Sequence, residues 1–123
     1  MVYDMDKESR TKKVTRWHSD RLLDQVRSWP KSVREQVGRQ LNKVEFGGVP
    51  DDFKPMRTIG PGVAEIRLSE MGDQFRLIYV AKFEEAIYVI HAITRKKSQK
   101  TSTLDMEVAR KRYSELVQQR KLE

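Results

Sequence analysis

Hydrophobic residues in the first part of the chain recur at intervals of three and four positions, the period of an amphipathic helix. One set consists of Leu22, Leu23, Val26 and Trp29. A second set consists of Val33, Val37, Leu41 and Val44. Ser19 or Asp20 can cap the first helix, Pro30 ends it or begins the next one, and Gly47-Gly48 stops the second. The pattern therefore predicts a helical hairpin.

After a loop at residues 49–56 that contains two prolines, the hydrophobic period changes to two, as in a strand. Over residues 63–68, apolar side chains alternate with Glu65 and Arg67. Residues 75–80 form a second strand, and residues 71–74 read as the hairpin connection. Residues 86–93 are almost continuously apolar, which predicts a central strand.

Two further elements complete the predicted domain. Val14–Trp17 is a short strand, and Thr103 can cap a last helix whose apolar face holds Met106, Ala109, Tyr113, Leu116 and Val117. The order β, α, α, β, β, β, α predicts an α+β fold: an antiparallel sheet with helices on one face, contributed by the N-terminal hairpin and the C-terminal helix. We expect one domain over residues 13–120. Residues 1–12 are polar, lack a period and are expected to form a flexible arm.

Composition narrows the class of protein. The 123 residues contain no cysteine, which excludes a disulfide scaffold, thiol catalysis and cysteine-ligated zinc. No apolar run approaches the roughly 18–20 residues that cross a bilayer, and the N-terminus lacks the apolar region of a signal peptide, so a cytoplasmic protein is expected. The formal net charge of +7 favours polyanionic partners.

The positive charge is concentrated in the strand segment. Residues 53–100 carry nine Lys and Arg against five Asp and Glu. The densest run is Arg95-Lys96-Lys97-Ser98-Gln99-Lys100, directly before Thr101. Such a run is either a solvated loop or a contact for phosphates, and the sequence leaves both readings open.

Several kinds of catalytic site are disfavoured. The only histidines are His18 and His91, and neither has a carboxylate at a metal-ligand spacing. There is no G-x-S-x-G elbow and no Walker or dinucleotide glycine pattern. We therefore expect no metal site.

The remaining candidates are cations on the predicted strands. Arg67 and Arg76 interrupt apolar strands joined by a short hairpin, so both can project from one face of the sheet. The alternative is that Arg67 pairs with Glu65 or Glu70 at the surface. The interruption of both strands favours a functional role, because charge on a half-buried sheet costs free energy unless it is paired or used.

Three other residues have two readings each. A lone histidine near the end of an apolar strand, as at His91, is more often a satisfied core residue than a catalyst. Tyr79 either packs in the core or offers its ring or hydroxyl to a base. Lys54 follows Phe53 in the proline-bounded loop and is a candidate phosphate contact.

These residue types suit metal-free RNA cleavage. The 2′-hydroxyl of RNA attacks its own 3′-phosphodiester, so the enzyme must align that oxygen, accept its proton, stabilise the phosphorane and protonate the leaving oxygen. Arginine matches phosphate oxygens with two parallel donors, and a histidine or lysine can transfer protons.

Five segments carry a resemblance to a known family: residues 52–56 (DFKPM), 60–67 (GPGVAEIR), 75–80 (FRLIYV), 88–93 (YVIHAI) and 96–101 (KKSQKT). Together they closely resemble the phage-derived HigB-like branch of the RelE/ParE toxin superfamily, from about Trp17 to about Leu116. One departure is Ile93, where relatives often carry phenylalanine.

The resemblance implies a RelE-like fold and the toxin of a type II toxin–antitoxin pair. HigB-like toxins cleave mRNA, typically on the ribosome, without metal or organic cofactor, and a helix-turn-helix antitoxin of the HigA type neutralises them. The implied catalytic residues are Arg67 and Arg76 on the scissile phosphate, with His91 or Lys97 for proton transfer. The residues expected to bind RNA are Lys54, Lys96, Lys100 and Tyr79.

Two alternatives from other classes stay open. The same fold hosts ParE-like inhibitors of DNA gyrase, so fold alone does not choose between the two activities. A non-catalytic module that binds nucleic acid or an antitoxin is the second alternative.

Overall fold

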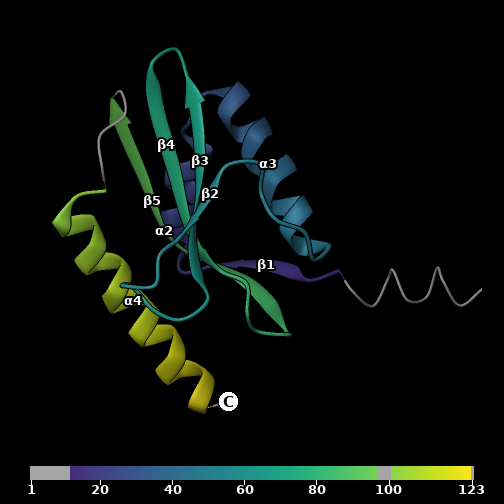
Figure 1. The fold of residues 1–123 in the computed structure, drawn as a ribbon, viewed down its shortest axis with the longest axis vertical. Coiled ribbons are helices and arrows are strands. Elements are labelled where there is room, and N and C mark those ends of the chain that lie inside the picture. Colours follow the sequence, from purple (N-terminus) through teal and green to yellow (C-terminus); the bar gives the residue numbers. More distant parts are fainter. Residues whose placement is uncertain (1–11, 97–100, 123) are drawn as a thin grey trace, which may run out of the picture.

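A computed structural model describes residues 12–96 and 101–122 (Figure 1). The elements in chain order are β1 (Val14–Trp17), α2 (Asp20–Arg27), α3 (Lys31–Glu45), β2 (Phe53–Pro55), β3 (Val63–Glu70), β4 (Asp73–Val80), β5 (Ala86–Lys96) and α4 (Thr103–Leu122). The expected N-terminal arm, apart from Lys12, lies outside the described residues, as do Lys97 and Lys100.

The helical hairpin is confirmed, and local chemistry explains its bounds. The Ser19 hydroxyl accepts a hydrogen bond from the Leu22 amide at 3.1 Å and caps α2. Pro30 occupies the N-cap position of α3. At α4, the hydroxyl that accepts from the Asp105 amide (3.1 Å) belongs to Ser102, so the predicted cap at Thr103 is wrong by one residue.

The strands form one five-stranded sheet in the order β1-β5-β4-β3-β2. β2, β3, β4 and β5 pair antiparallel, whereas β1 pairs parallel with β5. The predicted antiparallel sheet therefore needs correction at β1. The apolar strand β5 is an interior strand, but β4 occupies the centre. β5 also continues to Lys96, so the basic run begins inside a strand.

The segment predicted as a loop at residues 49–56 contains the edge strand β2. Phe53, Lys54 and Pro55 are all exposed and pair with Ile66, Glu65 and Ala64 of β3. No burial period marks this strand in the sequence, because its conformation is fixed by hydrogen bonds to β3. This pairing places Lys54 directly opposite Glu65.

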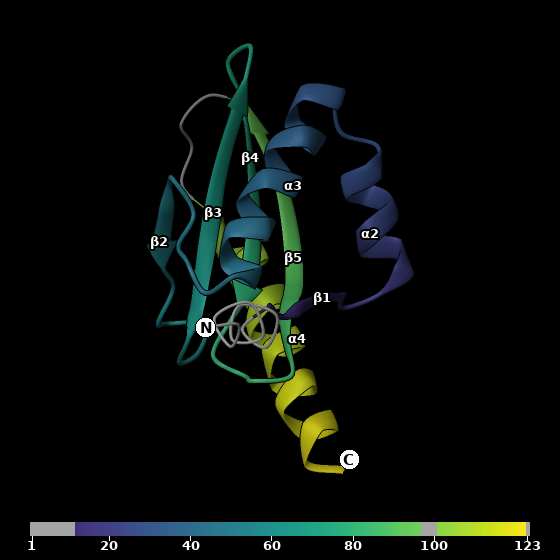
Figure 2. The same cartoon turned by 90° about the vertical axis from the view of Figure 1, so that its right-hand side faces the viewer.

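Helices cover both faces of the sheet, which corrects the expectation of helices on one face. Figure 2 shows α2 and α3 on one side of the sheet, where they pack on a face that includes Leu77 and Tyr79. α4 packs through Ala109 and Leu116 on the opposite face, which includes Ile78. Both faces need a cover, because adjacent residues of β4 point to opposite sides and are apolar on each.

Candidate functional site

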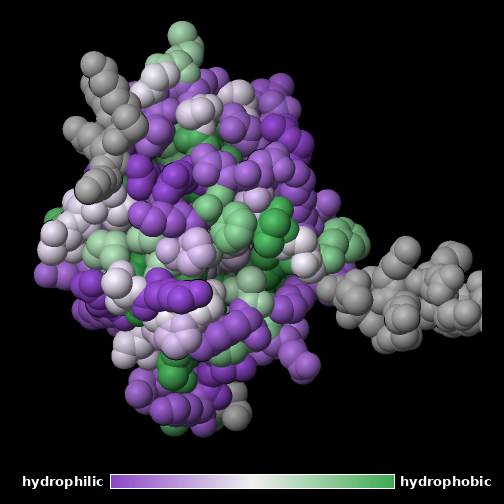
Figure 3. Space-filling view, in the orientation of Figure 1, coloured by the Kyte–Doolittle hydropathy of each residue, from purple (hydrophilic) through white to green (hydrophobic). Residues whose placement is uncertain are grey.

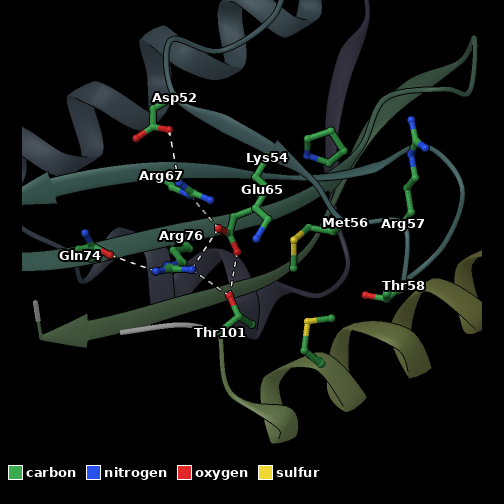
Figure 4. Close-up of a pocket in the computed structure, with 12 residues that line it drawn as sticks. Asp52, Lys54, Met56, Arg57, Thr58, Glu65, Arg67, Gln74, Arg76 and Thr101 are labelled. Carbon is green, nitrogen blue, oxygen red and sulfur yellow. Dashed lines mark hydrogen bonds and ion pairs between the residues drawn. The ribbon is translucent and has the colours of Figure 1, made fainter. Parts of the chain in front are cut away.

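A cavity of about 810 Å³ opens between β2, β3, β4 and the first turn of α4 (Figure 4). Four cationic side chains and two carboxylates line it: Lys54, Arg57, Arg67 and Arg76, with Asp52 and Glu65. Their formal charges sum to +2. In the space-filling view from the side of Figure 1, the surface is mainly hydrophilic, with apolar patches among the hydrophilic atoms (Figure 3). The cavity therefore combines a positive lining with room for a ligand larger than a single phosphate.

Arg67 and Arg76 lie directly opposite each other on β3 and β4. Residues that face each other in an antiparallel pair project from the same side of the sheet, so the prediction of a shared face is confirmed. The Arg67 side chain is 37% exposed, whereas that of Arg76 is only 10% exposed. Arg67 therefore presents its guanidinium to the cavity, and Arg76 forms part of the wall behind it.

The buried carboxylate of Glu65 holds the two guanidinium groups together. Its Oε1 accepts hydrogen bonds from Arg67 Nε and Arg76 Nη1, both at 3.1 Å, and its side chain is 1% exposed. Its Oε2 accepts from the Thr101 hydroxyl at 2.9 Å. The structure therefore has the ion pair between Arg67 and Glu65 that the sequence offered as an alternative, but Glu65 is buried and not at the surface. Since like charges repel, this carboxylate allows two arginines to lie side by side.

Arg76 makes further hydrogen bonds that fix its plane. Its Nη1 donates to the Thr101 hydroxyl at 3.0 Å, and its Nη2 donates to Gln74 Oε1 at 3.1 Å. The Arg67 amide donates to the backbone oxygen of Asp52 at 2.9 Å, and the Asp52 carboxylate lies 3.9 Å from Arg67 Nη1. The charged end of the cavity is thus organised before any ligand enters it.

Lys54 and Arg57 differ from the two arginines on β3 and β4. Within residues 12–96 and 101–122, no carboxylate lies within 4 Å of either side-chain cation. Both residues are exposed. A partly buried pair of hydrogen bonds anchors the loop before β2: Gln40 Nε2 donates to Asp51 Oδ2 (2.9 Å), and the Asp51 amide donates to Gln40 Oε1 (2.8 Å). The cavity therefore has two positioned cations and two available ones.

His91 is a buried residue of β5 that faces α4, and it is not among the residues that line the cavity. Its Nε2 lies 2.8 Å from Asp105 Oδ1, and its Nδ1 lies 3.1 Å from Arg112 Nη1. Because Arg112 can only donate, His91 Nδ1 accepts and Nε2 donates to Asp105. Burial lowers the pKa of His91, although its hydrogen bond to Asp105 works against this shift. This geometry agrees with the reading of His91 as a satisfied core residue.

Asp105 is the centre of that second cluster. Besides His91, it accepts hydrogen bonds from Arg95 and from the Ser102 hydroxyl (2.7 Å). Partial burial raises the pKa of Asp105, but the hydrogen bonds from His91 and Ser102 and the charge of Arg95 outweigh it, so the pKa is lowered. Arg95 and Ser102 flank residues 97–100 in sequence, so Asp105 joins the end of β5 to the start of α4.

Tyr79 lies on the face of the sheet away from the cavity. Its ring belongs to the core beneath α2 and α3, and burial raises the pKa of its hydroxyl to about 12. Strand alternation explains this, because Tyr79 and Arg76 are an odd number of residues apart on β4. Lys96 ends β5 opposite Asp73, and Lys97 and Lys100 lie outside the described residues.

Sequence reasoning missed several residues of the cavity. The sequence predicts Glu65 only as a surface partner of Arg67, although an acidic residue inside an apolar strand is a signal of a buried role. Thr101 stands in the sequence only as the residue after the basic run, whereas its hydroxyl bonds Glu65 and Arg76. No local pattern marked Arg57 or Gln74.

The described residues contain no group of three or more His, Asp or Glu side chains placed to hold a metal ion. None of their helices is long and apolar enough to cross a membrane.

Comparison with known proteins identifies the family of the chain. No curated protein and no solved structure matches the chain. The family model described as "Phage derived protein Gp49-like (DUF891)" matches residues 24–114, which span the elements from α2 into α4. This phage-derived family is toxin-like and associated with RelE-like proteins, and a toxin of this kind implies an antitoxin partner. Since the match covers well over half of the sequence, the chain belongs to the family of Gp49-like phage-derived proteins.

Proposed function

We propose that this protein is the toxin of a type II toxin–antitoxin pair and acts as a metal-independent endoribonuclease that cleaves mRNA on the ribosome. The observation that carries the proposal is the pair of guanidinium groups of Arg67 and Arg76, held side by side by Glu65 in a positive cavity. Membership of a toxin-like family supports the toxin role. The resemblance of residues 52–101 to HigB-like sequences supports RNA as the target.

The proposed reaction is an in-line transfer at phosphorus. The 2′-oxygen bonds to the phosphorus, the bond to the 5′-oxygen breaks, and the products are a 2′,3′-cyclic phosphate and a 5′-hydroxyl. The 2′-hydroxyl proton passes to a base, and an acid returns a proton to the leaving oxygen. The phosphorane between these states carries more negative charge than the substrate, so fixed cations beside it accelerate the step.

Arg67 is the group best placed to contact the phosphate. A guanidinium has five N–H donors. Among the described residues, Arg67 donates a hydrogen bond only from Nε, to Glu65, and the Asp52 carboxylate lies 3.9 Å from Nη1, so the Nη groups can donate to a ligand. Because Glu65 fixes the guanidinium before RNA arrives, little reorganisation is needed at the moment of reaction. Arg76 is more buried than Arg67, and its positive charge adds to the stabilisation of the phosphorane from the wall of the cavity. Lys54 holds a neighbouring phosphate at the edge of the cavity, as Lys96 and Lys100 would farther along the RNA.

For proton transfer we propose Lys97 first. It directly follows the last residue of β5 and precedes by four positions Thr101, whose hydroxyl lies in the cavity. His91 is the second candidate. Its ring would have to exchange Asp105 or Arg112 for RNA, because both nitrogens are engaged.

The proposed partners follow from the same reading. A helix-turn-helix antitoxin of the HigA type would neutralise the toxin, and the ribosome would present the mRNA. A single-stranded RNA must enter a site about 810 Å³ in volume, which a folded duplex would not do without unpairing.

The test is primer extension on a reporter mRNA in a reconstituted translation reaction, with ribosomes and without them. We expect cuts only when ribosomes are present, about 100-fold fewer with Arg67→Ala, and unchanged cutting with Arg27→Ala. Arg27 is a matched control, because it is an exposed arginine at the end of α2. If a folded, antitoxin-free sample makes no cuts, the proposal fails. A gyrase supercoiling assay then separates ParE-like inhibition from a binding module.

A further inference from the structure

The cavity has two ends of different chemistry (Figure 4). Glu65, Arg67 and Arg76 make the charged end. The other end has Met56 with two exposed polar residues, Arg57 and Thr58. Pro55, which precedes Met56, and Met106, which packs on the same hydrophobic cluster as Met56, also line the cavity. We call the surface of Pro55, Met56 and Met106 the methionine shelf. A site that bound only phosphates would have no use for it.

The shelf is built from two separate elements. Met56 follows β2 and is 8% exposed, and Met106 lies in the first turns of α4. Both side chains pack on the hydrophobic cluster beneath α4. Methionine sulfur is polarisable and makes favourable contacts with aromatic rings. The two thioethers therefore offer an apolar surface suited to a flat heteroaromatic group.

Backbone hydrogen bonds hold the shelf in place. The Met56 amide donates to the Val63 oxygen at 2.8 Å, and the Ile59 amide donates to the Met56 oxygen at 3.0 Å. From α4, Arg110 Nε donates to the Thr58 oxygen at 2.9 Å. The segment from Met56 to Ile59 is thus tied to both β3 and α4, and the apolar end of the cavity is formed without a ligand.

We propose that the methionine shelf is a nucleobase subsite. With the scissile phosphate at Arg67 and Arg76, the base of an adjacent nucleotide lies against Met56 and Met106, and Arg57 at the rim contacts a further phosphate or the base edge. This inference rests on the proposed function for its substrate, single-stranded RNA. It adds that affinity depends on a base next to the phosphate, because base stacking contributes to single-strand binding in addition to the charge.

The experiment uses short 2′-O-methyl RNA oligonucleotides, which cannot be cut because the 2′-oxygen is blocked. One probe carries all its bases, and two others are abasic on the 5′ or the 3′ side of the central phosphate. For the wild type we expect about tenfold weaker binding of one abasic probe, measured by titration calorimetry. In Met106→Ala this ratio falls to about twofold or less, while Met106→Leu restores most of it because leucine keeps the apolar volume.

Two controls separate the shelf from general effects. Met71→Ala removes a methionine that is 97% exposed at the turn between β3 and β4, so the ratio should stay unchanged. Arg67→Ala should weaken all probes by a similar factor, because the phosphate is common to them. A ratio that Met106→Ala leaves at the wild-type value overturns the subsite, and so does the absence of binding by every probe.

Cleavage and base preference are independent readouts. If the base preference depends on Met106 but no RNA is cut on ribosomes, the subsite is supported and the nuclease proposal fails. If RNA is cut and the ratio is insensitive to Met106, the nuclease proposal stands and the subsite fails. If all the probes fail to bind and an antitoxin peptide occupies the shelf instead, the nucleobase assignment is overturned.

Discussion

The carboxylates of Glu65 and Asp105 have partners of nearly the same kind but lie in different surroundings. Glu65 accepts hydrogen bonds from two arginines and Thr101. Asp105 accepts from Arg95, from His91 and from Ser102, the residue next to Thr101. Each carboxylate therefore gathers two nitrogen donors and one hydroxyl.

The two clusters differ in what lies beyond the carboxylate. Around Glu65 the donors face a cavity of about 810 Å³, and the Nη groups of Arg67 make no hydrogen bond to the part of the chain that the structure describes, with Asp52 3.9 Å away. Around Asp105 the donor His91 is covered by α4, and both of its ring nitrogens have partners. A hydrogen-bonded cation can bind a ligand only where space and spare donors remain. The first cluster is therefore suited to binding, and the second to joining α4 to β5.

The largest expected effect is on stability, at Glu65. In Glu65→Ala, Arg67 and Arg76 lose their common counter-charge, so we expect a loss of about 3–5 kcal/mol in the free energy of unfolding. Urea denaturation measures it. Glu107→Ala removes an exposed carboxylate of α4 and serves as the matched control. Equal midpoints for the two variants would contradict the assignment of Glu65 as the residue that holds the arginines.

The next effect separates the clusters by activity. Arg67→Ala should reduce ribosome-dependent cleavage about 100-fold, with less than about 1 kcal/mol lost in stability because the side chain is partly exposed. His91→Leu should show the reverse: a measurable loss of stability and cleavage within about threefold of wild type. Primer extension and urea denaturation on both variants make the comparison. A His91→Leu protein that is stable and inactive would move His91 into the catalytic group.

A smaller effect concerns pH and the Asp105 cluster. Burial lowers the pKa of His91 in the folded protein, below an unfolded value of about 6.5. Below that pH the unfolded chain binds more protons than the folded one, so the contribution of His91 to stability is complete above about pH 6.5 and is lost as the pH falls. The slope of stability against pH below about pH 6.5 should decrease in His91→Leu.

His18 is the control for this pH dependence. Burial is the main cause that lowers the pKa of His18 as well, and the charge of Arg112 acts in the same direction. His18→Gln should remove the contribution of His18 to the slope of stability against pH and leave the contribution of His91 unchanged. An unchanged slope in His91→Leu would show that the histidine does not titrate with unfolding.

The smallest effect belongs to the available cations. Lys54→Ala should weaken RNA binding a few-fold and reduce the slope of log affinity against log salt by about 0.7, the loss of one phosphate contact with a single strand. Lys31→Ala removes an exposed lysine at the start of α3, a helix on the face of the sheet opposite α4, and should leave the slope unchanged. A slope that Lys54→Ala does not alter would remove Lys54 from the RNA path.

The periodic elements could be predicted because the spacing of apolar residues within each element indicates which of its sides is buried. The stripe from Leu22 to Trp29 and the alternation around Arg67 and Arg76 each reflect one element's own geometry. β2 could not be found in this way, since three exposed residues including a proline become a strand only by pairing with β3. The face of the sheet on which α4 packs could not be predicted either. An apolar stripe indicates that one side of a helix is buried, but it does not indicate which surface covers that side.

The sequence alone indicated that Arg67 and Arg76 can share a face, because the side-chain period of a strand is two and a short hairpin joins the two strands. The register that pairs β3 with β4 then placed them opposite each other. The sequence also determined the excess of positive charge in the strand segment and the segments that resemble HigB-like toxins. Only the tertiary structure decided that Glu65 is buried between the arginines, that Tyr79 lies in the opposite core and that His91 bonds α4. These outcomes depend on contacts between residues far apart in the chain, and such contacts have no local period.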